Sequence, residues 1–283
     1  MVQIISDSTC DLSRDLLEKY KVEILPLHVI LGSQDYQDGL TITPDEIYRW
    51  SDENKQTPKT AAVSVEETME ALQPHLKEGR EVICFAISES MSSTANAMRL
   101  AAKRLQAEDQ VTVIDSANLS TGIGLLVIEA ARMAKAGMNA RQIAEVIEAL
   151  KPRVRASFVV DTLTYLHRGG RCSGVAAFVG STLKLHPRIA VENGKMAPGK
   201  KYRGRISRAI MDYVKDMEAD LKNAQKDRVF ITHSGCTEED IAAVRSYLQG
   251  LNHFDEILTT RAGSVVSSHC GPGTLGVLFI SGK

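Results

Sequence analysis

Apolar runs alternate with amphipathic segments through the first half of the chain. Four short runs have the apolar pattern of β-strands: residues 2–6, 24–31, 82–87 and 111–114. The third run, VICFAI, is apolar throughout, as expected of a strand that is covered on both faces. Between the runs, apolar residues recur at helical spacing, for example Met98, Ala101 and Leu105 in a helix expected from about residue 94 to 105. Such repeated βα units predict a parallel sheet with helices on both faces.

Capping signals mark where several of these helices begin. Thr43 and Glu46 form a capping box with Pro44 at the first helical position, and Ser64 forms a second capping box with Glu67. Further helices are expected after Ser13, through Leu125–Met133 and after Asn139.

The composition changes in the second half of the chain. A glycine-rich, basic stretch between Arg168 and Arg205 contains RGGRCSG and GKMAPGKKYRGR. A helix, a strand, a capped helix and two more strands are expected beyond it, in this order: 207–221, 229–232, after Thr237, near Ile257 and 277–280. We therefore predict an α/β protein with an N-terminal parallel-sheet domain over residues 1–160 and a C-terminal α/β domain over residues 161–283.

Composition and charge narrow the functional classes. The chain has 283 residues and a net charge of −1, so no overall field draws it to nucleic acid or to an anionic membrane. Its five cysteines are far apart and form no CxxC pair, which favours reduced thiols over a zinc site or a disulfide framework. The opening VQII is too short for a signal peptide, and no apolar run approaches the roughly 20 residues of a membrane span. We expect a cytoplasmic protein with no metal and no cofactor.

Two glycine patterns resemble nucleotide-binding motifs without the context that these motifs need. Residues 194–201, GKMAPGKK, fit GxxxxGK, but Lys201 replaces the hydroxyl residue that would hold magnesium. A glycine-rich turn with solvated lysines explains this stretch better. Residues 271–276, GPGTLG, fit GxGxxG, but too little chain follows for a dinucleotide site. We expect a tight turn there that lets the backbone approach a neighbour closely.

Hydroxyl side chains collect in loops that follow apolar runs or precede helices. The loops are residues 7–12, 58–64, 88–94 and 115–116. Serine and threonine at such positions are usually helix caps. Ligands of parallel α/β sheets bind outside the carboxyl ends of the strands, where helix N-termini offer free N–H groups. Several such loops at one edge therefore indicate a site for an anionic head group.

A histidine and several arginines add to this picture. His269 lies beside the glycine turn GPG, and an arginine cluster flanks or follows two glycines. An arginine cluster is most often a solvated face, but adjacent glycines permit the close approach of an anion or a phosphorylated group. The arginines are Arg168, Arg171, Arg203 and Arg205.

Eight motifs, taken in order, resemble those of the DegV family. They are IISDSTCDL, PKT…S, SESMSSTANA, VIDSANLSTGIG, LHRGGRCSG, YRGR, ITHSG and HCGPGTLGV, and they span nearly the whole chain. DegV proteins bind fatty acids and serve as the lipid-carrying subunit of bacterial fatty acid kinase. The resemblance implies two α/β domains with an acyl chain buried near their junction, a partner kinase that forms the acyl phosphate, and the possibility of transient membrane contact. It implies no catalysis by this chain alone, and the net charge already argues against a nucleic-acid partner.

The resemblance also assigns residues. It places the fatty-acid carboxylate on Thr60, Ser92 and His269, with the backbone N–H of Ser93 nearby. The arginines that would meet the partner kinase or the phosphoryl group are Arg168, Arg171, Arg203 and Arg205. The chain departs from the family pattern at four places, which bear on chain-length preference and partner choice: Ala61, Val63, Ser93 and His186-Pro187.

Two other functional classes remain open from the residues alone. Ser92 and His269 would be the nucleophile and base of a stand-alone hydrolase or small-molecule kinase, although no third orienting group is evident. A ligand-sensing or interaction protein is the other alternative.

Overall fold

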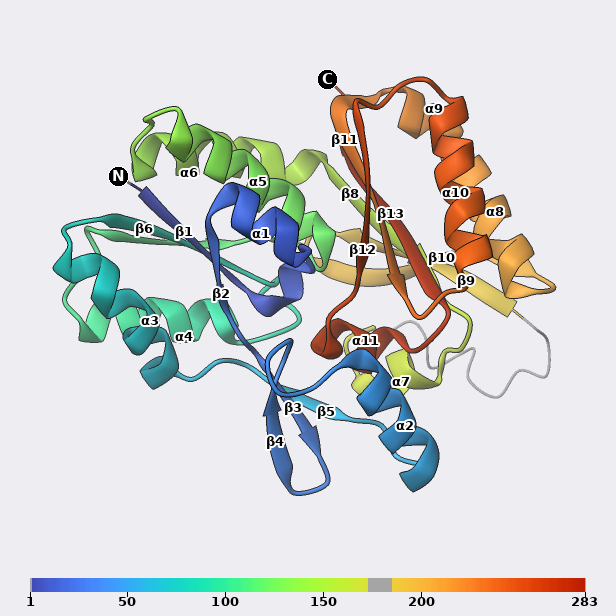
Figure 1. Ribbon diagram of the computed structural model, residues 1–283, viewed down its shortest axis with the longest axis horizontal. Helices are drawn as coiled ribbons and strands as arrows, with labels where there is room; N and C mark the ends of the chain where they lie inside the picture. The colour runs from blue at the N-terminus through green and yellow to red at the C-terminus, as the bar shows by residue number, and fades with distance from the viewer. Residues whose placement is uncertain (1, 173–184, 283) are drawn as a thin grey trace.

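The described part of the chain forms three β-sheets with helices around them (Figure 1). The computed structural model describes residues 2–172 and 185–282. A four-stranded parallel sheet lies toward the N-terminus, a six-stranded mixed sheet contains the C-terminal strands, and a small antiparallel sheet lies below both in the view of Figure 1.

The four-stranded sheet has the order β2-β1-β6-β7, and all of its strands are parallel. The strands are β1 Val2–Asp7, β2 Val22–Leu25, β6 Glu81–Ala86 and β7 Val111–Asp115. Successive strand residues point to opposite faces, so Ile4 packs with the helices α1, α5 and α6 while Ile5 packs with α3 and α4. These helices are α1 Arg14–Tyr20, α3 Val65–Lys77, α4 Thr94–Arg104, α5 Thr121–Lys135 and α6 Ala140–Leu150. The predicted parallel sheet with helices on both faces is confirmed.

The six-stranded sheet has the order β10-β9-β8-β13-β11-β12. Only β11 and β12 are parallel neighbours, and the other pairs are antiparallel. Its strands are β8 Val154–Val159, β9 Leu185–Glu192, β10 Lys195–Arg203, β11 Ala224–Ser234, β12 Glu256–Arg261 and β13 Thr274–Ser281. One face packs on α8 Ile206–Asp216, α9 Glu218–Lys222 and α10 Glu238–Gly250.

Helix α5 lies between the two large sheets and is buried along most of its length. Ten of its fifteen residues are buried, and its apolar side chains belong to one core cluster with strands of both sheets. Ile4 and Phe85 join this cluster from the first sheet, and Phe158 and Leu278 join it from the second. The hydrophobic core is therefore continuous across both sheets.

The small sheet, of order β4-β3-β5, connects the two halves of the molecule. Its strands are β3 His28–Leu31, β4 Gln34–Gln37 and β5 Lys59–Ala61. It packs through Val29 and Leu31 against α2, and the same cluster includes Val265 of α11. The helices near it are α2 Pro44–Asn54, α7 Thr164–Gly169 and α11 Ser264–Cys270. An N-terminal hairpin and a C-terminal helix thus share one core.

The prediction of one strand over residues 24–31 is wrong. The run divides at Pro26 into β2, which lies in the parallel sheet, and β3, which lies in the small sheet. Proline has no N–H to donate to a ladder, so it interrupts a strand that would otherwise continue. The next residue, Leu27, donates its N–H to Ser8 Oγ instead of to a neighbouring strand.

The second half also differs from expectation in several elements. β8 precedes the boundary predicted at residue 160, yet it pairs with β9 and β13, so the second sheet begins at Val154. The turn expected over residues 194–201 is confined to Asn193-Gly194, and the lysines follow on β10. The helix expected over 207–221 divides at Met217 into α8 and α9. The last two residues of the LHRGGRCSG motif, 173 and 174, lie outside the described residues.

The turn and capping predictions are confirmed where backbone chemistry decides the structure. Thr43 with Glu46 and Ser64 with Glu67 form complete capping boxes. Gly271 has a φ of 76° and lies so close to Tyr165 that a Cβ would be 2.7 Å from the ring. None of the helices in the described residues is both long and apolar enough to span a bilayer.

We predict that Gly276→Ala destabilises the protein by about 1–3 kcal/mol, because overpacking in a tight core costs energy of this order. Gly276 pairs with Phe158 across β13 and β8, and a Cβ there would lie 2.9 Å from the carbonyl oxygen of Ser157. Urea unfolding measures the change. Gly250→Ala is the control, since a Cβ at this helical position meets no atom within 4 Å and should leave stability unchanged or slightly higher. Equal unfolding midpoints for Gly276→Ala and the parent would contradict the prediction.

Candidate functional site

The candidate site lies at the carboxyl ends of the parallel strands β1 and β6. β1 has β2 on one side and β6 on the other, so the chain connections diverge between β1 and β6. In open parallel sheets, this divergence leaves a crevice outside the strand ends. Residues from β5, α11 and β10 close over the crevice. Parts of both large sheets and of the small sheet therefore contribute to one site.

A narrow, mostly apolar cavity of about 60 Å³ occupies this crevice. Its polar lining residues are Thr60, Ser92, Arg171 and His269. The rest of its wall is apolar: Leu27, Ala61, Ala62, Ile87, Met91, Leu119, Met196, Val265, Val266 and Cys270. The cavity thus has an apolar wall with a few hydrogen-bonding groups, which is typical of small-molecule sites in proteins.

A second cavity of about 20 Å³ continues from the first. The two cavities share three lining residues, Leu119, Val266 and Cys270. Phe158 and Leu278 of the six-stranded sheet line the second cavity. Apolar space is therefore present both in the crevice and toward the core between the two sheets, and the three shared residues border both cavities.

Thr60 and His269 form the central polar contact of the site. The Oγ1 of Thr60 lies 2.7 Å from Nε2 of His269. Thr60 is on β5, where it pairs with Val29 of β3, and His269 is near the end of α11. Two elements 209 residues apart in sequence are thus joined by one hydrogen bond.

Burial keeps His269 uncharged. Its Nδ1 is buried and has no hydrogen-bond partner among the described residues, and a Cβ on Gly169 would lie 2.3 Å from that atom. Loss of solvent, together with the positive charge of Arg171, lowers the pKa of His269 to about 4. At neutral pH the ring is therefore a polar but neutral group in an apolar wall.

Ser92 reaches the cavity, whereas Ser93 does not line it. The Ser92 hydroxyl lies 2.9 Å from Oγ1 of Thr94 and accepts a hydrogen bond from the Thr94 backbone N–H at 3.3 Å. Ser92 thus both caps the start of α4 and borders the cavity. Ser93 is exposed, and its side chain makes no capping bond. No hydrogen bond connects Ser92 to His269, so the described contacts do not form the nucleophile–base pair of a hydrolase.

Only one of the four predicted arginines lines the cavity. Arg171 donates to the carbonyl oxygens of Gly169 at 2.7 Å and of Met91 at 3.4 Å, which fixes its side chain beside the cavity. The other three are exposed: Arg168 on α7, Arg203 at the end of β10 and Arg205 before α8.

Two of the four hydroxyl-rich loops do not line the cavity. Their side chains form hydrogen bonds that fix the surrounding backbone. Ser116 bonds within its own loop, to the carbonyl oxygen of Asn118. In the loop after β1, the carboxylate of Asp7 accepts from the Thr9 hydroxyl at 2.5 Å and from the Ile87 N–H at 2.7 Å. Asp7 thereby connects the ends of β1 and β6.

Two further buried carboxylates fix the start of α11, and sequence reasoning did not identify them. Asp11 accepts from Ser120 Oγ at 2.5 Å and from the Gly263 N–H at 2.8 Å. Asp38 accepts from the Ser264 N–H at 2.6 Å and from Ser8 Oγ at 2.8 Å. Burial raises the pKa of Asp11 to about 8 and that of Asp7 to about 6. The only sequence signal was that Asp7 and Asp11 occur in a hydroxyl-rich loop after an apolar strand.

We predict that His269 stays uncharged through the neutral range, because its pKa lies near 4. NMR titration of the imidazole signals, assigned with a His269→Gln variant, tests this directly. The depressed pKa also means that the folded state resists protonation, so the contribution of His269 to the free energy of unfolding should be lost as pH falls from about 6.5 through about 4. A titration midpoint near the ordinary histidine value of about 6.5 would contradict the assignment.

Comparison with known proteins identifies the family. The family model described as an uncharacterised protein of the DegV family matches residues 1–282. A DegV domain-containing protein of Deinococcus radiodurans is 33% identical over 276 residues, which cover 98% of this chain and 97% of that protein.

Solved structures agree with the sequence match. A DegV family protein from Thermus thermophilus, whose structure is described in terms of fatty acid binding, superposes with a TM-score of 0.91 at 31% identity and covers 99% of each chain. A stearic acid-binding protein from Eubacterium ventriosum superposes with a TM-score of 0.86 at 31% identity, over 99% of this chain and 98% of that one. The chain belongs to the DegV family.

Proposed function

We propose that this protein binds a long-chain fatty acid, with the acyl chain in the apolar cavities and the carboxylate at Thr60, Ser92 and His269. The observation that carries the proposal is the contact between Thr60 and His269, a neutral hydrogen-bonding pair at the wall of an otherwise apolar cavity. The solved DegV proteins described as fatty acid-binding support the same ligand class.

The tail supplies most of the affinity in this proposal. Burying about 15 methylenes contributes roughly 12 kcal/mol before the costs of ordering the ligand. The two cavities total only about 80 Å³ (60 and 20), so side chains must move to admit the chain. Met91 and Met196 line the first cavity and have flexible, unbranched side chains that repack readily. Leu119, Val266 and Cys270 separate the cavities, and the chain would pass between them.

In this proposal, uncharged hydrogen-bond donors hold the carboxylate head group. If Nε2 of His269 carries the ring proton and donates to Thr60 Oγ1, the Thr60 hydroxyl proton is available for the carboxylate. This tautomer leaves only a lone pair at the buried Nδ1, whereas the other tautomer would leave an unpaired N–H there. The Ser92 hydroxyl and the N–H of Ser93 would complete the donor set. Neutral donors hold a carboxylate without a buried ion pair, so the head group stays releasable.

The proposal includes presentation of the carboxylate to a partner kinase, which forms the acyl phosphate. Arg171 is the cation beside the cavity, and Arg168, Arg203 and Arg205 are exposed where a partner or a phosphoryl group can reach them. Phosphorylation adds negative charge that the neutral donors cannot satisfy, and guanidinium groups bind phosphate oxygens in a bidentate way. Catalysis in this scheme belongs to the partner.

We predict that Ser92→Ala and His269→Gln each weaken fatty-acid affinity about 5- to 30-fold, or roughly 1–2 kcal/mol. Ser92→Ala removes a hydrogen bond to the carboxylate, whereas His269→Gln removes the Nε2–H that donates to Thr60 and thereby leaves the Thr60 hydroxyl proton available for the carboxylate. Titration with oleate or palmitate measures the affinity, and mass spectrometry of the freshly purified protein identifies co-purifying lipid. Ser90→Ala is the matched control, since Ser90 is an exposed serine of the same loop that does not line the cavity. Recovery of no lipid, together with no uptake of added fatty acid, would rule out the binding function.

We also predict that Arg171→Ala and Arg205→Ala lower acyl-phosphate formation by a fatty acid kinase catalytic subunit at least about tenfold, on the scale of a lost charge-assisted contact. Fatty-acid affinity should change much less. Arg141→Ala on α6 is the control, because this exposed arginine forms an ion pair with Glu145 one turn away and lies on a different element from the cavity. Unchanged phosphoryl transfer in both test variants would exclude a role for these arginines.

A further inference from the structure

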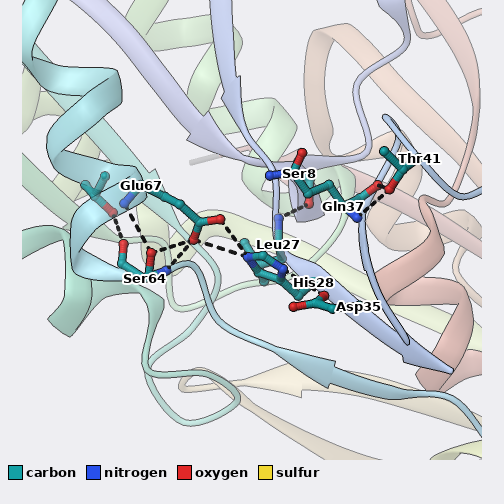
Figure 2. A network of polar contacts seen from close by, with 9 residues as sticks. Ser8, Leu27, His28, Asp35, Gln37, Thr41, Ser64 and Glu67 are labelled. Atoms are coloured by element: carbon teal, nitrogen blue, oxygen red, sulfur yellow. Dashed lines mark hydrogen bonds and ion pairs between the residues drawn. The ribbon is translucent and has the colours of Figure 1, made fainter. Parts of the chain in front are cut away.

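His28 lies between two carboxylates on the small sheet (Figure 2). Its Nδ1 is 2.9 Å from Oδ1 of Asp35, and its Nε2 is 3.0 Å from Oε1 of Glu67. Asp35 belongs to β4 and Glu67 to the first turn of α3, so the ring joins two elements that no strand ladder connects. The side chain of His28 is only 15% exposed. Its two partners are more exposed, Asp35 at 59% and Glu67 at 30%, so solvent screens the contact with Glu67 less than the contact with Asp35.

Only the protonated ring satisfies both carboxylates. Imidazolium donates from both nitrogens, whereas neutral imidazole has one N–H and one lone pair. In the neutral state, a lone pair would therefore face either Asp35 or Glu67, and that contact would become repulsive. Burial lowers the pKa of His28, but the hydrogen bonds to Glu67 and Asp35 outweigh burial and raise it above the ordinary value.

The contact with Glu67 holds one end of the cavity wall. Residues 60–62 line the cavity, and they run from β5 to the capping box of α3. At the β5 end, the ladder fixes them to β3 through the pairs Ala61 with His28 and Thr60 with Val29. At the α3 end, Glu67 accepts from the N–H of Ser64 at 2.8 Å and also contacts His28. His28 therefore ties the start of α3 back to the strand that positions Thr60.

We propose that His28 is a protonation-dependent positioning residue for the cavity wall formed by residues 60–62, and that its deprotonation speeds the release of a bound acyl ligand. The release part rests on the proposed fatty-acid function, whereas the wall part does not. Leu27, next to His28, also lines the cavity, so movement of β3 relative to α3 changes the cavity from two sides.

Other charged groups near His28 do not supply the same tether. Lys59 pairs with Ile30, two residues along the ladder from the Ala61–His28 pair and on the same face of the small sheet, and it is exposed. On α3, Glu66 is bound to Arg104 and not to His28. The buried Asp7, Asp11 and Asp38 also have raised pKa values, but they act on β1 and α11. The effect of His28 must therefore be measured as a difference between variants at each pH.

The direction of the effect follows from the raised pKa. Below that pKa, the protonated ring of His28 donates to both Asp35 and Glu67, and the cavity wall stays in place. As pH rises through it, above the ordinary value of about 6.5, one contact is lost and the wall opens more often. Loss of one partly buried charged contact changes such an opening equilibrium by about three- to tenfold.

Hydrogen–deuterium exchange of the protein without added ligand tests the wall part of the proposal. His28→Gln should exchange about three- to tenfold faster than the parent in residues 59–67 near pH 6, and equally fast above about pH 8. Asp35→Asn, an exposed position, should lower the pH at which the parent loses protection, because it removes one of the carboxylates that favour imidazolium. An identical ratio of His28→Gln to parent exchange at both pH values would overturn the proposal.

His75→Gln is the matched control. His75 Nε2 contacts Glu23 at 2.7 Å, its side chain is 12% exposed, and it lies at the far end of α3 from the cavity wall. Its replacement should leave the pH profile of residues 59–67 unchanged. A profile altered as much as in His28→Gln would show that any buried histidine contact on α3 has this effect, which would overturn the specific role of His28.

Release of pre-bound oleate into acceptor vesicles of phosphatidylcholine tests the second part. The release rate of the parent should rise about three- to tenfold between about pH 6 and pH 8 relative to His28→Gln, which should release oleate quickly throughout. If oleate never binds while the exchange result holds, the fatty-acid function fails and the tether stands. If oleate binds but the ratio of rates is the same at every pH, the tether does not control release and the proposal fails.

Discussion

The candidate site depends on the anchoring of the first turn of α11. This helix has only seven residues, which is too short to be stable alone in water. Its first backbone N–H groups are satisfied by Asp11 and Asp38, carboxylates that come from two different N-terminal loops. These N–H groups have no partner within the helix, so the hydrogen bonds that the carboxyl oxygens accept offset part of the cost of burying them. These two contacts fix the start of the helix that carries His269 to Thr60.

The site then combines neutral polar groups with apolar surface. A buried arginine or lysine opposite the head group would attract a carboxylate more strongly. Burying that cation would, however, cost desolvation free energy. His269 avoids this cost because burial and Arg171 keep it uncharged at neutral pH. Arg171 is fixed by the carbonyl oxygens of Met91 and Gly169 instead of entering the Thr60–His269 pair. The Thr60–His269 pair therefore carries no charge at neutral pH, and the cation beside it is held by backbone carbonyl groups.

The sequence predicted those parts of the fold that local chemistry decides. The capping boxes of Ser64 and Thr43 gave helix starts, and the apolar run at 82–87 gave a central strand. The sequence alone could not place β8 in the second sheet, because the sheet to which a strand belongs depends on its pairing with residues far along the chain. Pro26 was a visible interruption in the run at 24–31, and its effect on the ladder was overlooked.

Prediction of the site shows the same division between local and distant causes. The family resemblance selected Thr60, Ser92 and His269, all of which line one cavity. Nothing in the residues alone indicated that His269 would contact Thr60 and not Ser92, since β5 and α11 meet only through the tertiary fold. The carboxylates of Asp11 and Asp38 were missed for the same reason: their partners are backbone N–H groups more than 200 residues away.

Helix α5 has a consequence for how the molecule holds together. Its buried side chains fill space against both large sheets at once, so neither half retains a complete interior when the other is removed. If the chain were cut between the sheets, the N-terminal piece would expose the apolar face of α5 that packs on the second sheet, and exposed apolar surfaces promote aggregation. The two sheets should therefore melt in a single cooperative step, and whatever occupies the crevice between them stabilises the entire chain against unfolding.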